Sequence, residues 1–234
     1  MKALIFDCDG VLVDTERDGH RVAFNQAFEE AGLGVTWDVP LYGKLLKVAG
    51  GKERIKHYFD THGWPEGQDP DTLVPALHKR KTAIFTELIA SGALPLRAGI
   101  VRIVEAAHAA GIRLGVCTTS NPKSVDGVLD LMGSTRKGYF EIVLAGDIVS
   151  KKKPDPEIYN LAKQRLELDG GDCVVIEDSR NGLLAAIGAG MPCLITTSTY
   201  TTEEDFREAA RVVPELGDPP NVCVTLEDLL SIAG

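Results

Sequence analysis

Short apolar runs that end at polar side chains constrain the fold of this chain most strongly. The first run, residues 3–6, is too short for a helix and is followed at once by Asp7, so it predicts a buried parallel strand. Similar runs recur along the chain, and apolar residues at helical spacing lie between them. The predicted strands are residues 3–6, 112–117, 142–144, 173–176, 192–195 and 222–224, and the predicted helices are 100–110, 123–132, 155–166 and 181–189. This alternation predicts an α/β fold, with a parallel sheet and helices on both of its faces.

Residues 17–90 interrupt this alternation with helices alone. Apolar residues repeat at helical spacing over the segments 17–32, 37–48, 52–62 and 71–89, and glycine or proline turns separate these segments. The sequence therefore predicts two domains. A small all-helical domain of residues 16–92 is inserted after the first strand of a core that residues 1–15 and 93–234 form.

Two carboxylates follow the first strand. On an extended chain Asp7 and Asp9 point to the same side, with Cβ atoms about 6.6 Å apart, and Gly10 allows a sharp turn just after them. Ligands of open α/β sheets bind beyond the carboxyl ends of the strands. There, one acid can attack or hold a cation while the other moves a proton. An isolated pair of this kind can also simply cap a turn, so the residues after the later strands decide between the two interpretations.

Polar side chains also follow the second and third strands. The second strand ends at Thr118, which is followed by Thr119, Ser120 and Asn121. Hydroxyls and free amides at the start of a helix can bind an anion, although such a run is also an ordinary helix cap. Lys153 follows the third strand, just before a proline that opens the next predicted helix, and could point its ammonium into the same crevice. The three-lysine run that contains it could also be a solvated surface patch.

The fourth strand ends at two further acids, Glu177 and Asp178. Buried acids must be paired or bind a metal, and two in succession exceed what a helix cap needs. Hard oxygen ligands favour Mg²⁺. The sequence therefore predicts an acidic magnesium site in one crevice with the carboxylates Asp7 and Asp9, an anion-binding hydroxyl and a lysine.

At these residues the chain resembles the haloacid dehalogenase superfamily of phosphotransferases, and the similarity covers the whole chain. The resemblance implies a Rossmann-like core and a helical cap that closes on the substrate. It makes Asp7 the nucleophile and Asp9 the general acid and base, with Thr118 and Lys153 as further catalytic residues. The magnesium ligands that it implies are Asp7, the backbone carbonyl of Asp9 and Asp178, with Glu177 acting through water.

The inserted helical domain is expected to select the substrate. Its candidate substrate-binding residues are Glu16, His20, Tyr42, Gly50, Gly51, Lys52, Arg54, Arg80 and Lys81. The turn at residues 50–54 combines free amides at a helix start with two cations and could clamp a second phosphate, but it is as readily an ordinary helix start. Glu16 could hold substrate hydroxyls, and Tyr42 could stack on a sugar or form a hydrogen bond with it. His20 resembles a cap histidine of the family, displaced by one residue.

Residues 14–16, 20–25 and 200–219 show a finer resemblance, to the xylulose-1,5-bisphosphate phosphatases associated with Rubisco. It implies removal of the 1-phosphate to leave xylulose 5-phosphate, by a soluble protein of a plastid stroma or of the cytoplasm of a photosynthetic bacterium. A phosphomutase of the β-phosphoglucomutase type uses the same motifs, and a phosphoglycolate-type phosphatase is another alternative. A receiver-like signalling domain is disfavoured, because its phosphorylated aspartate follows a later strand and its chain is much shorter.

Composition limits the partners. The net charge of −9 argues against a broad nucleic-acid or anionic-membrane surface, so the expected partner is a small phosphorylated sugar, and we expect a monomer. No apolar run is long enough to span a bilayer. The five cysteines show no paired metal-ligand spacing and are expected to be reduced and associated with strands.

Overall fold

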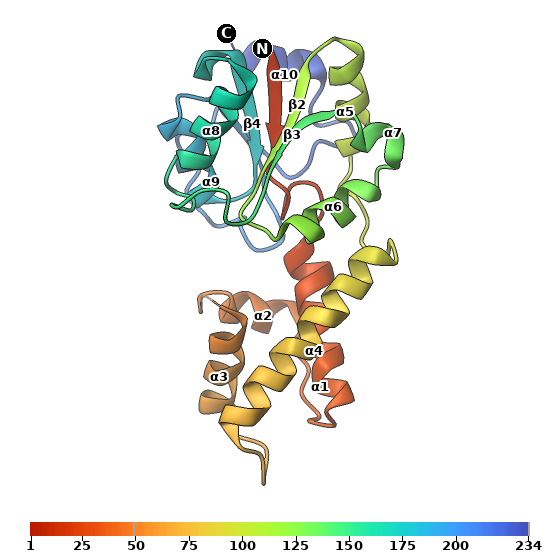
Figure 1. Ribbon diagram of the computed structural model, residues 1–234, viewed down its shortest axis with the longest axis vertical. Helices are drawn as coiled ribbons and strands as arrows, with labels where there is room; N and C mark the ends of the chain where they lie inside the picture. The colour runs from red at the N-terminus through yellow and green to blue at the C-terminus, as the bar shows by residue number, and fades with distance from the viewer. Residues whose placement is uncertain (49, 234) are drawn as a thin grey trace. The chain divides into compact units, whose positions relative to one another are not determined.

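The computed structural model describes residues 1–48 and 50–233 and divides the chain into two compact units (Figure 1). The core unit contains Met1–Asp14 and Pro95–Gly234, and the helical unit contains Thr15–Leu94. The sequence placed the divisions after residues 15 and 92, whereas the units divide after residues 14 and 94.

A parallel sheet forms the centre of the core unit, with the strand order β3-β2-β1-β4-β5-β6. Its strands are β1 (Ala3–Phe6), β2 (Arg113–Cys117), β3 (Phe140–Leu144), β4 (Cys173–Glu177), β5 (Cys193–Thr196) and β6 (Arg211–Val213). β1 is entirely buried between β2 and β4, with Ile5 opposite both Gly115 and Val175. The strand order runs outward from β1 in one direction and from β4 in the other. The carboxyl ends of these two strands therefore form the switch point at which α/β proteins bind ligands.

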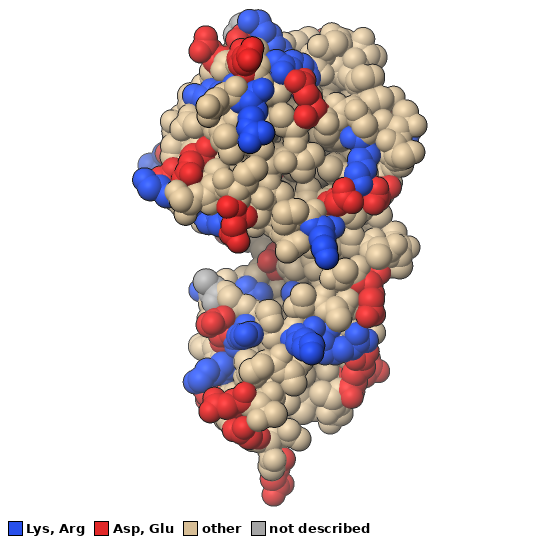
Figure 2. Space-filling view, in the orientation of Figure 1, with Lys and Arg blue, Asp and Glu red and all other residues tan. Residues whose placement is uncertain are grey.

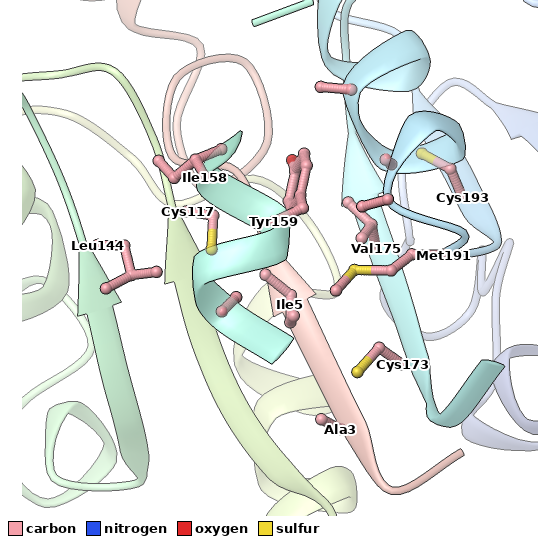
Figure 3. Close-up of a cluster of buried hydrophobic side chains, with 14 of the residues drawn as sticks. Ala3, Ile5, Cys117, Leu144, Ile158, Tyr159, Cys173, Val175, Met191 and Cys193 are labelled. Carbon is pink, nitrogen blue, oxygen red and sulfur yellow. The ribbon is translucent and has the colours of Figure 1, made fainter. Parts of the chain in front are cut away.

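Helices cover both faces of this sheet, which confirms the predicted fold class (Figure 1). They are α5 (Ile100–Ala109), α6 (Pro122–Asp130), α7 (Ser134–Lys137), α8 (Glu157–Leu166), α9 (Arg180–Gly188) and α10 (Leu226–Ile232). Figure 3 shows the buried cluster in which α8 packs on the sheet, where Ile158 and Tyr159 face Ile5, Cys117 and Val175. α5 packs on β2 and against α10, on the other side of the sheet.

One predicted strand is wrong. Residues 222–224 are irregular, and the backbone amides of Cys223 and Val224 both donate to Leu216 O rather than to a neighbouring strand. The sixth strand is instead β6, and α10 was not predicted. Val222 is exposed, so this short apolar run does not mark a buried strand. Cys223 is therefore not associated with a strand, although all five cysteines are free as predicted.

The helical unit consists of helices and their connections. A π-helical turn over Thr15–His20 is followed by α1 (Arg21–Glu30), α2 (Val39–Leu45), α3 (Gly51–His62) and α4 (Pro70–Ala90). The carboxylates of Asp38 and Asp69 accept hydrogen bonds from Leu41 N and Asp71 N in the first turns of α2 and α4, which fixes where these helices begin. α1 packs along α4. The interior is aromatic and contains Phe24, Phe28, Trp37, Tyr42 and Phe59. No strand occurs among residues 15–48 and 50–94.

Charges of both signs are interspersed on the visible face of each unit (Figure 2). Many charged side chains of the chain form exposed ion pairs, such as Lys2 with Asp172 and Lys56 with Asp60, and pairs of this kind contribute little to stability. Within the described part of the chain, no helix combines the length and the apolar character needed to cross a bilayer.

Candidate active site

The loop after β1 carries the two predicted catalytic acids. The backbone amide of Asp7 donates to Ile176 O at 2.9 Å and so extends the pairing of β1 with β4. Gly10 then turns the chain with a φ of +80°, which is costly for other residues. A Cβ at Gly10 would lie 2.0 Å from Asp178 Oδ2. This loop can lie against Asp178 because residue 10 has no side chain.

Lys153 lies between the acids. Its ammonium donates to Asp7 Oδ1 at 2.6 Å, to Glu177 Oε1 at 2.5 Å and to Cys117 O at 2.9 Å, so each of its three hydrogens has an acceptor. Its side chain is only 8% exposed. Burial lowers the pKa of Lys153, but the carboxylates of Asp7 and Glu177 outweigh burial and raise the pKa above its ordinary value. The lysine is therefore charged. One detail of the prediction is corrected: α8 begins at Glu157, so a turn separates Lys153 from the helix.

Three buried carboxylates surround a position that could hold a metal ion. Asp7, Glu177 and Asp178 each offer one oxygen, and these oxygens lie within 4.8 Å of one another. Burial raises the pKa of Asp7 to about 8; Lys153 opposes this shift, while Glu177 and Asp9 add to it. Burial also raises the pKa of Asp178, and the charges of Glu177 and Asp7 raise it further. The carboxylates therefore need more positive charge than one lysine supplies.

The residues present fit a magnesium ion. Three carboxylates next to one ammonium leave an excess of negative charge in a buried position, which is costly unless a cation compensates for it. Hard carboxylate oxygens are the ligands that Mg²⁺ prefers. Asp7, Glu177 and Asp178 would supply them. The further ligand predicted from the sequence, the backbone carbonyl of Asp9, remains a prediction.

The loop after β2 contacts Asp9, the second acid that follows β1. Thr118 is buried, and its backbone amide donates to Leu144 O at 2.9 Å. Its Oγ1 accepts a hydrogen bond from Ser120 N at 3.2 Å, and the Ser120 hydroxyl donates to Asp9 Oδ2. Thr119 is exposed. Of the hydroxyls of the predicted anion site, that of Ser120 therefore contacts Asp9, and Thr118 is joined to it through the Ser120 amide.

Two predicted substrate-binding residues have structural partners instead. The side chain of Asn121 accepts a hydrogen bond from Lys123 N at 2.9 Å and so caps α6. Arg80 forms ion pairs with Glu30 at 2.5 Å and with Glu87 at 3.1 Å, which joins α4 to α1 on the surface. The structure does not support a substrate contact for either residue.

A chain of hydrogen bonds joins Glu16, Tyr42 and Arg54 within the helical unit. Tyr42 OH donates to Glu16 Oε2 at 2.6 Å, and Arg54 Nη1 donates to Tyr42 OH at 3.0 Å. Arg54 also donates to the carbonyl oxygens of Leu45 and Val48, at 3.2 Å and 3.4 Å. Tyr42 is 0% exposed and Arg54 is buried. The predicted contact of Tyr42 with a sugar remains a prediction, and Arg54 has a role in holding the chain before α3.

His20 and Lys81 form a second buried pair of the helical unit. Lys81 Nζ lies 2.9 Å from His20 Nδ1, and the His20 ring lies 3.8 Å from that of Phe85. Burial, followed by the charges of Lys81 and Arg54, lowers the pKa of His20 well below its ordinary value. An ammonium can only donate, so Nδ1 accepts and the imidazole is neutral.

The predicted phosphate clamp begins α3. Gly50 precedes the helix with a φ of +90°, and Gly51 is its first residue. A Cβ at Gly51 would lie 2.7 Å from the ring of His78, so the turn packs closely on α4. Lys52 is exposed and lines a cavity of about 190 Å³ together with Lys56. Of the cations predicted for this turn, Lys52 is the one that faces solvent.

Three residues without a sequence motif also hold the site. Tyr159 OH donates to Glu177, Ser198 hydrogen-bonds the side chain of Asp178, and Arg97 donates to Gly10 O. Tyr159 belongs to the apolar face of a helix, and Arg97 is an isolated charge, so nothing in the sequence distinguishes them. Ser198 follows β5, and extending the rule of polar residues after strands to this strand would have found it.

Comparisons with known proteins point to one family. A family model of haloacid dehalogenase-like hydrolases matches residues 1–190. A CBBY-like protein of Arabidopsis thaliana is 52% identical over 224 residues, which cover 93% of this chain and 70% of the relative.

Two solved structures have the same fold. A mutant of CbbY from Rhodobacter sphaeroides, in complex with xylulose-(1,5)bisphosphate, is 36% identical with a TM-score of 0.77, over 98% of this chain and 99% of that one. A putative beta-phosphoglucomutase from Thermotoga maritima is 26% identical with a TM-score of 0.73, over 92% of this chain and 96% of that one. The resemblance inferred from the sequence is confirmed: the chain belongs to the haloacid dehalogenase-like hydrolases and is a phosphatase related to the CbbY proteins.

Proposed function

We propose that this phosphatase is Mg²⁺-dependent and removes one phosphate from a sugar bisphosphate through an aspartyl phosphate on Asp7. The observation that supports this proposal is the convergence of Asp7, Lys153, Glu177 and Asp178 at the carboxyl ends of β1 and β4. A carboxylate nucleophile requires a cation beside it, because both the nucleophile and the phosphate are anionic. Bound magnesium would offset part of this charge and polarise the phosphoryl group.

In the proposed first step, an oxygen of Asp7 attacks phosphorus in line, and the bond from phosphorus to the sugar oxygen breaks. Lys153, which donates to Asp7 Oδ1, holds the attacking carboxylate in place. Asp9, in its protonated form, gives its proton to the departing alkoxide. The Thr118 hydroxyl would donate to a phosphoryl oxygen.

In the second step, Asp9 is a carboxylate and takes a proton from water, which attacks the aspartyl phosphate. Inorganic phosphate leaves and Asp7 is regenerated. The Ser120 hydroxyl donates to Asp9 Oδ2 and so restrains the side chain that moves both protons.

The most specific substrate that we propose is xylulose 1,5-bisphosphate, with xylulose 5-phosphate as the product. Support comes from the Rhodobacter sphaeroides CbbY mutant, which binds xylulose-(1,5)bisphosphate. In the helical unit we propose Lys52 and Lys81 as cations that select a second phosphate, Glu16 as a partner of sugar hydroxyls, and His20 as the neutral partner of Lys81. We also propose a soluble monomer of a plastid stroma or of a photosynthetic bacterium, for which the Arabidopsis and Rhodobacter relatives are the support.

Phosphate release from a panel of mono- and bisphosphorylated sugars, with and without Mg²⁺, tests the proposal. We expect release from ketose bisphosphates only with Mg²⁺, and no turnover by Asp7→Asn, whose amide cannot attack. An active Asp7→Asn would overturn the nucleophile assignment.

The similarity to a putative beta-phosphoglucomutase keeps a phosphomutase as the second candidate. Incubation with glucose 1-phosphates, assayed separately for released phosphate and for isomer formation, distinguishes the two reactions. Isomer formation without net phosphate release would favour the mutase.

A further inference from the structure

Tyr159 is a buried tyrosine that contacts two residues of the candidate metal site. It is the third residue of α8 and is 0% exposed, within the apolar cluster of Figure 3. Its hydroxyl donates to Glu177 Oε1 at 2.6 Å. Lys153 Nζ lies 5.0 Å from the centre of its ring. One side chain therefore contacts both the acid that follows β4 and the lysine that joins this acid to Asp7.

The ring of Tyr159 completes the surroundings of Lys153. The three hydrogens of the ammonium point to Asp7, Glu177 and Cys117, and the aromatic ring lies within the range of a cation–π contact. An ammonium held in this way cannot turn toward another acceptor without losing one of these contacts.

The hydroxyl of Tyr159 fixes the carboxylate of Glu177. Oε1 accepts from both Tyr159 and Lys153, and Oε2 accepts from Asp178 N at 3.1 Å. Close packing of Gly182 on the same carboxylate limits its movement further. Because Oε1 is held by two donors, Oε2 is the oxygen that stays beside Asp178.

We infer that Tyr159 is a positioning residue for the metal site: it holds Glu177 with Oε1 on Lys153 and Oε2 on the backbone amide of Asp178. This inference rests on the proposed function. Partners that orient the groups around a metal commonly change metal affinity about 10–100-fold when they are removed. Without the hydroxyl, the buried carboxylate keeps one donor on Oε1 and can rotate away from the arrangement that suits the cation.

The test compares the wild type with Tyr159→Phe, which keeps the ring and its contact with Lys153, and with Tyr139→Phe. Tyr139 is a matched control because it stacks on His108, with ring centroids 3.6 Å apart, and contacts neither Glu177 nor Lys153 in the structure. Calorimetric titration with MgCl₂ of the substrate-free proteins measures metal affinity directly. The Mg²⁺ concentration for half-maximal phosphate release provides a second measure.

We expect Tyr159→Phe to bind Mg²⁺ about tenfold more weakly than the wild type and to recover much of its turnover at saturating Mg²⁺. Tyr139→Phe should match the wild type in both measurements. If Tyr159→Phe binds Mg²⁺ like the wild type and differs only in melting temperature, its role is structural and the inference is wrong. A wild type that neither binds Mg²⁺ nor releases phosphate would instead refute the proposed function, and this inference with it.

Discussion

Replacing Gly182 with alanine tests how closely α9 packs on Glu177. A Cβ at residue 182 would lie 2.0 Å from Glu177 Cδ and 2.1 Å from each carboxylate oxygen. The carboxylate or the helix would have to move by roughly 1.4 Å before the new Cβ reached an ordinary van der Waals distance from Glu177. Alanine itself favours a helix by about 0.5–1 kcal/mol, whereas overpacking costs about 1–3 kcal/mol, so the clash is the larger effect.

We therefore expect Gly182→Ala to lower the free energy of unfolding by about 1–2 kcal/mol. We expect phosphate release to fall about a hundredfold, because a catalytic group displaced by roughly 1 Å commonly costs that much. Urea unfolding and phosphate release at saturating Mg²⁺ measure the two quantities. Gly188→Ala on the same helix is the matched control, since its Cβ would meet Pro156 Cβ at 3.3 Å and needs only a small adjustment. A Gly182→Ala variant as stable and as active as the wild type would refute the reasoning.

Two further predictions concern stability and are measured by urea unfolding. Because the pKa of His20 lies well below its ordinary value in the folded chain, the unfolded chain binds the extra proton below about pH 6.5. The stability that neutral His20 contributes is complete above that pH and is lost as the pH falls, by up to about 1.4 kcal/mol per pH unit. His20→Gln should therefore lose less stability on acidification than the wild type, and equal losses would contradict this prediction. Arg97→Lys should lower the free energy of unfolding by about 2–3 kcal/mol. One ammonium cannot replace the hydrogen bonds that the guanidinium donates to Gly10 O, Thr197 O and Pro214 O. An unchanged free energy of unfolding would contradict the assigned contacts.

The core of the candidate site could be predicted because strand ends have a simple signal. An apolar run that stops at a polar residue marks a carboxyl end, and parallel strands bring these ends to one edge of the sheet. Asp7, Thr118, Lys153 and Glu177 were found in this way. The same rule failed at residues 222–224, because a short apolar run carries no information about whether its backbone pairs with a strand.

The helical unit was harder to predict residue by residue. Helical spacing shows which positions share a face, but it does not show which polar atoms of that unit meet one another. Tyr42 and Arg80 were therefore expected to contact substrate. In the structure, Tyr42 forms hydrogen bonds with Glu16 and Arg54. Arg80 forms ion pairs with two glutamates. Tyr159 was missed for the opposite reason, since a tyrosine on an apolar helix face looks like a core residue until its one oxygen is placed.

The buried acids of the core unit make metal binding depend on pH. Burial raises the pKa of Asp7 to about 8, so a proton competes with a cation for this carboxylate. A divalent ion can enter only as such protons leave, so its binding releases acid into the solvent and becomes tighter as the pH rises toward 8.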